Sequence, residues 1–600
     1  MDLSLHRIVI LVEMAFILII AYCVWQKTLL PYTYLFAAMI LGVSLAISIV
    51  KSSDRADKYI ILQIFLVFFL LTHIYYLSSQ NIIPFGDAYW DYAVVKTFAQ
   101  ESHVFVIHGM VKPTEAAGYS ELTWYSGWPL LHTLGLSFCQ VSGIDPFYLN
   151  LIIPSLFGFV SFALVYLLVE KLRIKLHFGK EITIFALLVY ATSPEAIFWQ
   201  MQFVKQSFAI VLFTLILYLL CVSTLYKPNR RYSAILIVLA LLLVVSHHFT
   251  SFTVVSFLIL FSAFLAVGRY VEKIKILEHL FWSPRKVSFL GIALLMCTFM
   301  FVWWDSFGNV IWPTVQSRLT RFMEILKNMQ TVQFFVPKAY YPTVLRPVWI
   351  PPFLLLRDLI MYAPAFLGFL LILTKISKMP AKSFVVYSIL TFGLIFLIDD
   401  VFFALEPLRV VLLVMPLLAF LSSVFYNKIR DRSKLAWKAI VSMVIILFVL
   451  SSFGGLWAHD FAPIHLYNPS INPIEIGEVT PYFIRLKSFF EHKIAVENLQ
   501  TVRADSIDPL VYLLNPNEYD KIKSLPTENV QQLGEEEANL VCSFKDLNMY
   551  IYYGGIWTPI KTLEEAETVQ YELRQYLNGY FNRVYSDGRN ILWITPKNTS

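Results

Sequence analysis

Long apolar segments alternate with short polar ones along most of the chain. A membrane-spanning helix needs about 20 apolar residues in succession, and by that measure the sequence predicts about thirteen transmembrane helices. The expected spans are residues 8–26, 33–50, 59–78, 147–169, 181–197, 205–225, 233–247, 250–268, 287–305, 353–375, 383–401, 408–426 and 436–455. No A-x-A cleavage site follows the first span, so we expect it to be a retained helix. The pattern predicts an all-α polytopic membrane domain over residues 1–455.

The C-terminal residues 456–600 contain no apolar run of transmembrane length. Residues 539–544 have the pattern of a strand, and 583–594 have that of a hairpin. Between them, residues 563–581 show helical periodicity. We therefore expect a small soluble domain of mixed α/β structure after the membrane domain.

Positive charge is confined to one set of short loops. These basic loops are residues 171–175, 227–231, 285–286, 375–382 and 428–432. Short loops rich in Lys and Arg stay in the cytoplasm. The two large loops, 79–146 and 306–352, and the C-terminal domain are then expected on the extracytoplasmic side. In a prokaryote, the protein would lie in the cytoplasmic membrane.

Composition agrees with a membrane protein and excludes other classes. The 600 residues are 58% hydrophobic and 15% charged, with a mean hydropathy of +0.64, whereas a soluble domain is about 25% charged. The net charge of +6 does not indicate nucleic-acid binding, because the basic residues lie in the short loops between spans. The five cysteines are scattered, so the chain has no disulfide framework and no zinc-site spacing.

Two carboxylates stand out in Gly86–Tyr92, at the start of the first large loop. Asp87 and Asp91 follow a long apolar helix at the predicted membrane surface, where an uncompensated carboxylate is costly. If the segment is helical, the spacing of four places both on one face. Such a pair can bind a divalent cation or supply a general base. Alternatively, both solvate a helix end, with Asp87 as its cap.

Basic and imidazole side chains recur on the same predicted side. Lys205 follows Gln200 and Gln202, and could either contact a phosphate or anchor the helix at the membrane interface. His247 and His248 could orient a phosphate or a sugar hydroxyl, or pack at that interface. No phosphate-binding loop, dinucleotide fingerprint or nucleophile elbow occurs in the sequence.

The segment Gly-Asp-x-x-x-x-Tyr at residues 86–92, leading into an amphipathic helix, resembles the GT-C superfamily. These integral-membrane glycosyltransferases use sugars linked to polyprenyl phosphate. Residues 125–131 resemble the aromatic-Pro-Leu-Leu segment that follows their first large loop, and the likeness in arrangement covers residues 59–425. The chain departs from the family plan because its acidic loop follows the third span rather than the first, which two extra N-terminal helices would explain.

The resemblance implies two catalytic carboxylates. Asp87 corresponds to the catalytic or metal-binding aspartate of the family, and Glu195 resembles its second acidic position, or is a charge at a helix amino end after Pro194. Asp91 has no counterpart in the family; as a neighbour of Asp87, it would support that residue together with Glu195. Ala88 follows Asp87 where mannosyltransferase-like members have Asp-Glu, so the identity of the base stays open. If a divalent cation such as Mg²⁺ or Mn²⁺ is a cofactor, Asp87 and Glu195 would hold it.

The resemblance also implies a site for the donor phosphate. Arg409, at the start of an apolar helix, matches a late arginine-bearing element of the superfamily and could grip a phosphate bidentately. A snorkelling anchor is the other interpretation. Lys205, His247 and His248 complete the predicted phosphate-binding set.

The function implied is transfer of a sugar from a polyprenyl-phosphate donor to a glycan, lipid or protein acceptor outside the membrane. One alternative is an oligosaccharyltransferase or glycan ligase that uses a lipid-pyrophosphate donor. Against it, Trp303-Trp304-Asp305 matches the family's WWD motif in letters but ends a transmembrane helix, and the motif is absent after residue 456. A transporter or flippase is the other alternative, although the acidic groups cluster at one face and no internal repeat is found.

Overall fold

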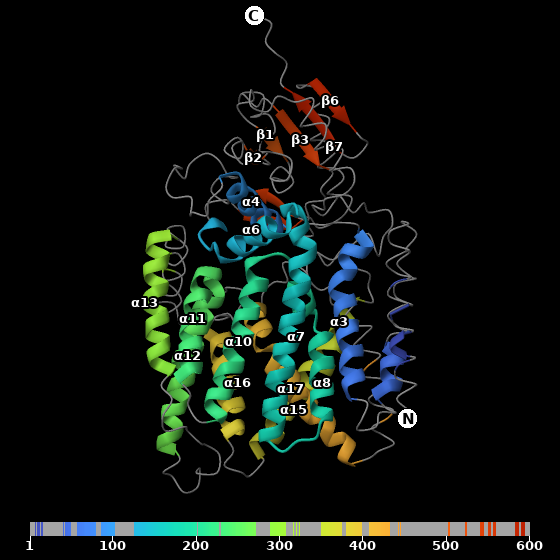
Figure 1. Cartoon of the computed structure of the whole chain (residues 1–600), viewed down its shortest axis with the longest axis vertical. Coiled ribbons are helices and arrows are strands. Elements are labelled where there is room, and N and C mark those ends of the chain that lie inside the picture. The colour runs from blue at the N-terminus through green and yellow to red at the C-terminus, as the bar shows by residue number, and fades with distance from the viewer. Residues whose placement is uncertain are drawn as a thin grey trace, which may run out of the picture.

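A computed structural model shows a helix bundle with a small β-structure beyond one end (Figure 1). The residues that the structure describes are 42–49, 57–79, 86–101, 125–200, 202–226, 230–271, 289–307, 350–374, 380–398 and 407–432, seven strands between 502 and 594, and isolated positions elsewhere. All statements below concern these residues.

Long helices make up the body of the bundle. They are α3 (Asp57–Ser79), α7 (Leu149–Lys175), α8 (Glu181–Ala191), α10 (Lys205–Leu225), α11 (Arg230–Ser246), α12 (His248–Val271), α13 (Phe289–Phe307), α15 (Ile350–Thr374), α16 (Pro380–Ile398) and α17 (Pro407–Arg432). Within the described ranges, six segments are long and apolar enough to cross a membrane: 146–175, 205–225, 248–268, 289–306, 380–398 and 409–430. The chain is an integral membrane protein.

The predicted span 181–197 is wrong as a single helix. The structure contains α8, which ends at Ala191, and a separate short helix α9 (Pro194–Gln200). Pro194 cannot donate a backbone hydrogen bond to the preceding turn, so it cannot continue α8 but is favoured at a helix start. The Ser193 hydroxyl accepts a hydrogen bond from the Ala196 N–H at 3.4 Å, which caps α9.

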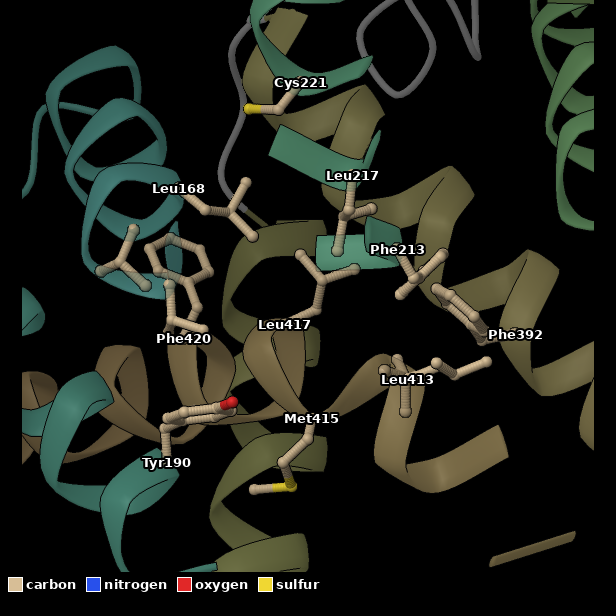
Figure 2. Packing of buried hydrophobic residues seen from close by; sticks show 14 of the residues in the cluster. Leu168, Tyr190, Phe213, Leu217, Cys221, Phe392, Leu413, Met415, Leu417 and Phe420 are labelled. Carbon is tan, nitrogen blue, oxygen red and sulfur yellow. The ribbon is translucent and has the colours of Figure 1, made fainter. Parts of the chain in front are cut away.

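Helix α10 occupies the centre of the bundle and α13 its edge. In the most apolar 18-residue stretch of each helix, 83% of the residues are buried in α10 but only 28% in α13. Figure 2 shows Phe213 and Leu217 of α10 facing apolar residues of α16 and α17, with Leu168 of α7 nearby. The Phe213 ring meets the Phe392 ring edge-on, with centroids 5.9 Å apart. This apolar core holds the ends of the central helices in place.

Helices α15 and α17 cross at a glycine. A Cβ atom at Gly368 of α15 would overlap the backbone carbonyl oxygen of Leu421 in α17. The two backbones approach this closely because glycine has no side chain. Two hydrogen bonds reinforce the contact: Ser422 Oγ donates to Met361 O at 2.7 Å and Tyr426 Oη to Ile360 O at 2.7 Å.

Two further helices, α4 (Gly86–Glu101) and α6 (Leu130–Ser142), lie across one end of the bundle (Figure 1). The short 3-10 helix η1 (Pro146–Tyr148) links α6 to α7. A Cβ atom at Gly135 of α6 would lie 3.0 Å from Leu149 Cδ1, 3.1 Å from Phe203 Cζ and 3.4 Å from Val95 Cγ2. This glycine therefore lets α6 pack tightly against α4, α7 and the residues just before α10.

The C-terminal region forms two sheets. The larger has the strand order β2-β1-β3-β7-β6, and the smaller pairs β4 with β5. The strands are β1 (Val502–Ala504), β2 (Ile522–Ser524), β3 (Leu540–Phe544), β4 (Tyr550–Tyr553), β5 (Ile556–Pro559), β6 (Asn582–Ser586) and β7 (Asn590–Ile594). Strand β1 runs parallel to β2 and β3, whereas β7 is antiparallel to β3 and β6. The strand predicted at 539–544 and the hairpin predicted at 583–594 are confirmed.

Several predicted elements lie outside the described residues. They are the helix at 563–581, nearly all of the spans 8–26 and 436–455, and most of the loop 306–352. The large loop 79–146 is partly described and holds α4 and α6. The predicted helical start of that loop is confirmed, and the helix begins early enough to include both Asp87 and Asp91.

Candidate active site

The amino ends of α10, α12 and α17 converge beneath α4 and α6. The Gln206 side-chain amide in α10 donates a hydrogen bond to Thr250 Oγ1 in α12 at 3.3 Å. The Arg409 guanidinium in α17 lies over the Phe249 ring of α12, 5.9 Å from its centroid. Helix amino ends carry unpaired N–H groups and partial positive charge. Their convergence produces a region suited to bind an anion.

Asp91 connects α4 to this region. Its Oδ1 atom is 2.7 Å from His132 Nε2 of α6, and its Oδ2 accepts a hydrogen bond from the Lys205 backbone N–H at 3.1 Å. The Lys205 ammonium lies 3.6 Å from the same Oδ1 atom. Asp91 and His132 are each 0% exposed. Both carboxylate oxygens therefore have partners from other helices.

The Lys205 side chain is surrounded by aromatic rings. Its ammonium lies 3.5 Å from the centroid of the Tyr125 ring and 5.6 Å from that of Trp128, and it donates to the Tyr125 carbonyl oxygen at 3.4 Å. The Trp90 ring of α4 stacks on Tyr125, with centroids 6.1 Å apart. Aromatic faces stabilise a cation that has left water. Lys205 is only 5% exposed, so this stabilisation matters.

A hydrogen-bond chain orients His247. The Thr250 hydroxyl lies 3.0 Å from His247 Nδ1, and the Thr250 backbone N–H donates to the same nitrogen at 3.3 Å. Nδ1 is therefore the acceptor of the ring, and Nε2 is its N–H donor. The neighbouring His248 packs on Trp128, with ring centroids 4.7 Å apart. Each imidazole is thus held in place by packing or hydrogen bonding.

Arg409 completes the group from the side of α17. Its guanidinium lies 5.3 Å from the centroid of the Trp199 ring in α9. The His247 and His248 rings lie 4.8 Å apart, and His248 packs on the Trp128 ring that the Lys205 ammonium also faces. Arg409 lies over Phe249, the residue that follows these histidines. The structure therefore brings together the four residues predicted to bind a donor phosphate. We call them the basic cluster: Lys205, His247, His248 and Arg409.

The burial of His132 keeps its imidazole neutral. Burial lowers the pKa of His132 below its ordinary value of 6.5, although the nearby Asp91 carboxylate opposes the shift. A neutral ring that donates Nε2–H to Asp91 leaves Nδ1 as an acceptor, and this atom has no hydrogen-bond partner among the described residues. Lys205 already compensates the charge of Asp91, so a second cation is not needed.

Sequence reasoning missed three of these residues: Tyr125, Trp128 and His132. The aromatic-Pro-Leu-Leu segment containing Tyr125 and Trp128 was noticed only as a family resemblance. A lone histidine in an apolar helix gives no signal by itself. The Trp303 indole N–H donates to the Gly127 carbonyl oxygen at 3.0 Å, which ties α13 to the same segment. This contact gives part of the Trp-Trp-Asp sequence a structural role.

For Asp87 and Glu195, the structure gives only the position of each residue within its helix. Asp87 lies in the first turn of α4, four residues before Asp91, and Glu195 is the second residue of α9. Their side chains lie outside the described part of the structure, so their catalytic roles stay predictions. Among the described residues, no group of three or more His, Cys, Asp or Glu side chains could hold a metal ion. Asp87 and Glu195 are not among these side chains, so the predicted divalent-cation site stays a prediction.

No protein-family model and no curated protein sequence matches this chain. Solved structures do resemble it in arrangement. The oligosaccharyltransferase of Archaeoglobus fulgidus, in its apo form, is 12% identical with a TM-score of 0.47, covering 91% of this chain and 76% of the enzyme. ArnT from Cupriavidus metallidurans bound to undecaprenyl phosphate is 10% identical with a TM-score of 0.46, and the match covers 90% of this chain and 98% of ArnT.

The arabinofuranosyltransferase AftD from Mycobacteria is a third similar structure. It is 13% identical with a TM-score of 0.47, and the match covers 92% of this chain but 40% of AftD. All three are GT-C glycosyltransferases, the superfamily that the sequence resembles. At TM-scores below 0.5, the likeness by itself assigns no activity to this chain.

Proposed function

We propose that this chain is a membrane glycosyltransferase that transfers a sugar from a polyprenyl-phosphate donor to a glycan, lipid or protein acceptor. The observation that carries the proposal is the basic cluster at converging helix amino ends, beside the α4 aspartates. Cationic side chains and helix amino ends together favour a phosphate ligand. The apolar helices beneath this end suit a lipid chain attached to that phosphate.

In the proposed reaction, the acceptor hydroxyl attacks the anomeric carbon of the donor sugar. Asp87 accepts the hydroxyl proton as a general base, and the bond between the anomeric carbon and the phosphate oxygen breaks. The polyprenyl phosphate leaves with the bonding electrons. Lys205 and Arg409 offset the negative charge that develops on it. Glu195 would assist Asp87, or hold a divalent ion with it if one takes part.

The site is proposed to face the extracytoplasmic side. The connection between α7 and α8 and the end of α17 carry basic residues, and both lie at the end opposite the basic cluster. Short basic loops remain in the cytoplasm. The position of the charged groups also supports an enzyme over a transporter, since transporters place such groups near the membrane midplane.

The test is sugar transfer in membranes that contain the protein. Radiolabelled polyprenyl-phosphate sugars are supplied, and transfer to endogenous acceptors is compared between wild type and Asp87→Asn at matched expression. We expect wild type to transfer label and Asp87→Asn to lose about 100-fold or more, because the base is removed. Asp57→Asn is the matched control, since Asp57 lies on α3 at the other end, 3.4 Å from Lys180.

Two outcomes would contradict the proposal. Equal transfer by wild type and Asp87→Asn would remove Asp87 from the mechanism. No transfer by wild type with any monophosphate donor would reject the donor class. A parallel assay with a lipid-pyrophosphate glycan would then test the oligosaccharyltransferase alternative, and a lipid-flipping assay would test the transporter.

A further inference from the structure

Asp91 makes contacts that a reacting carboxylate would not keep. Its side chain is 1% exposed, and both of its oxygens are engaged by His132 and Lys205. A general base must come within hydrogen-bond distance of the acceptor hydroxyl. To reach one, Asp91 would have to release partners from both α6 and α10. These contacts suit a structural connection between helices better than a proton acceptor.

The carboxylate replaces a missing helix cap. Val204, the residue before α10, has extended backbone geometry and an apolar side chain, and it makes no side-chain cap. Asp91 accepts a hydrogen bond from the first N–H of α10 across 114 positions in sequence. A carboxylate at a helix amino end is stabilised both by this hydrogen bond and by the helix dipole. Asp91 thus caps α10 from a different helix.

The same carboxylate compensates the Lys205 ammonium. The charged and titratable groups around Lys205 come from several elements: Asp91 on α4, Arg409 on α17, and the imidazoles of His132, His247 and His248. Asp91 is the described carboxylate in direct contact with the ammonium. Removing one partner of a buried ion pair leaves an uncompensated charge, which is strongly unfavourable.

His132 supports Asp91 from the opposite side. Its ring packs edge-on against Phe98, which lies two turns beyond Asp91 in α4, with ring centroids 6.1 Å apart. The tight packing at Gly135 keeps α6 close to both α4 and the start of α10. These contacts hold the imidazole where its Nε2–H is directed at the carboxylate.

We propose that Asp91 and His132 are positioning residues that fix the amino end of α4 to the amino end of α10. The first turn of α4 carries Asp87, and the first residue of α10 is Lys205. This connection therefore sets the proposed base at a constant distance from the basic cluster. The inference rests on the proposed function for the reaction, and it changes the predicted role of Asp91 from catalytic to positioning.

A double-mutant cycle on thermal unfolding tests the connection without any activity. Asp91→Asn, Lys205→Met and the double variant are purified in detergent and compared with wild type. We expect each single variant to lower Tm. The decrease in Tm of the double variant should be smaller than the sum of the decreases in the two single variants, because the second substitution removes the charge that the first leaves uncompensated. Asp57→Asn and Lys180→Met form the control cycle at an exposed pair, where we expect additive effects.

Two outcomes of the double-mutant cycle decide whether Asp91 and Lys205 connect the two helices. Additive losses at Asp91 and Lys205 would overturn the inference. If Asp91→Asn alone cannot be recovered as folded protein while the double variant can, the inference is supported in its strongest form. Neither result depends on the identity of the substrate, so failure of the proposed function leaves this test intact.

Steady-state kinetics separate positioning from chemistry. We expect Asp91→Asn to lower kcat about tenfold without raising KM for the polyprenyl-phosphate sugar, since a lost negative charge does not weaken phosphate binding. His132→Gln, which retains a side-chain N–H donor, should keep most of kcat, whereas His132→Leu should match Asp91→Asn. A loss in Asp91→Asn as large as in Asp87→Asn, with Tm unchanged, would make Asp91 a reacting group and reject the proposal.

Discussion

The two ends of the helix bundle differ in how far their ion pairs are exposed to water. At the end covered by α4 and α6, Asp91 and Lys205 are 0% and 5% exposed. At the other end, Lys180 pairs with Asp57 and Arg430 pairs with Glu181, and these side chains are 22% to 59% exposed. The ion pair described at the first end is removed from water, whereas these two pairs at the second end stay partly exposed. The second end also holds a buried lysine, Lys382, which is 2% exposed and donates to the Leu373 carbonyl oxygen.

This difference indicates where the protein uses charge for function. An exposed ion pair contributes about 0–1 kcal/mol, so the pairs at the second end are weak restraints between helices. Burying an ion costs several kcal/mol, which is tolerated only where geometry or ligand binding offsets it. The first end holds the stronger sign of a binding site, because its buried Lys205 lies near Arg409 and two histidines, whereas the buried Lys382 at the second end donates to a backbone carbonyl. Lys and Arg at the second end fit the charge rule for membrane orientation.

The largest expected effect that would separate the two ends is on donor binding. Lys205→Met should weaken the affinity for a polyprenyl phosphate by about 10- to 100-fold, because a charge-assisted contact to phosphate is lost. Binding can be measured by competition with a labelled polyprenyl phosphate in detergent. Lys180→Met, which removes an exposed lysine at the second end, is the matched control and should bind as wild type does. If Lys205→Met and Lys180→Met bind the polyprenyl phosphate with equal affinity, the two ends do not differ in donor binding.

A smaller effect is expected from pH. The folded-state pKa of His132 is below its unfolded value, so the unfolded state takes up the proton first as pH falls below about 6.5. Stability is then complete above that pH and decreases below it, by up to about 1.4 kcal/mol per pH unit for this group. The difference in Tm between pH 7.5 and 5.5 should be larger in wild type than in His132→Gln. An identical pH dependence would show that His132 is not buried as a neutral ring.

The smallest effect is expected at the second end. Arg430→Gln removes the charge that pairs with Glu181, and both side chains are more than 30% exposed. We expect a loss of about 0.5 kcal/mol or less, and no change in donor binding. Thermal unfolding at low and high salt measures this, since an exposed pair is screened by salt. A salt-independent loss of several kcal/mol would mean that this end is as tightly coupled as the first.

Some features of the site were accessible from sequence because they are local. Asp87 and Asp91 were predicted from their spacing in an acidic segment, and α4 holds both. Lys205 was recognised as a basic residue at the start of an apolar helix on the predicted outer side, whereas Arg409 was proposed because its segment resembles a late arginine-bearing element of the GT-C superfamily. Such positions can be read from a single segment and its flanking charge.

Other features depended on contacts between distant segments. The break between α8 and α9 was missed because the apolar pattern continues through Ser193-Pro194, although proline restricts helix continuation. His132 was missed because its partner Asp91 is 41 residues away and no local pattern joins them. The catalytic role of Asp91 was predicted from its spacing to Asp87, and that spacing does not reveal that Asp91 is buried.

The sequence by itself determined that this is a membrane protein, where most of its helices run and which short loops are basic. These properties follow from local hydrophobic length and local charge. Only the tertiary structure decided that Asp91 caps α10, that His132 supports it, and that Lys205, His247, His248 and Arg409 meet. The physical reason is that these contacts arise from how helices pack around α10. The close approach of α6 at Gly135 involves residues of α4, α7 and the segment before α10, which are far apart in the chain.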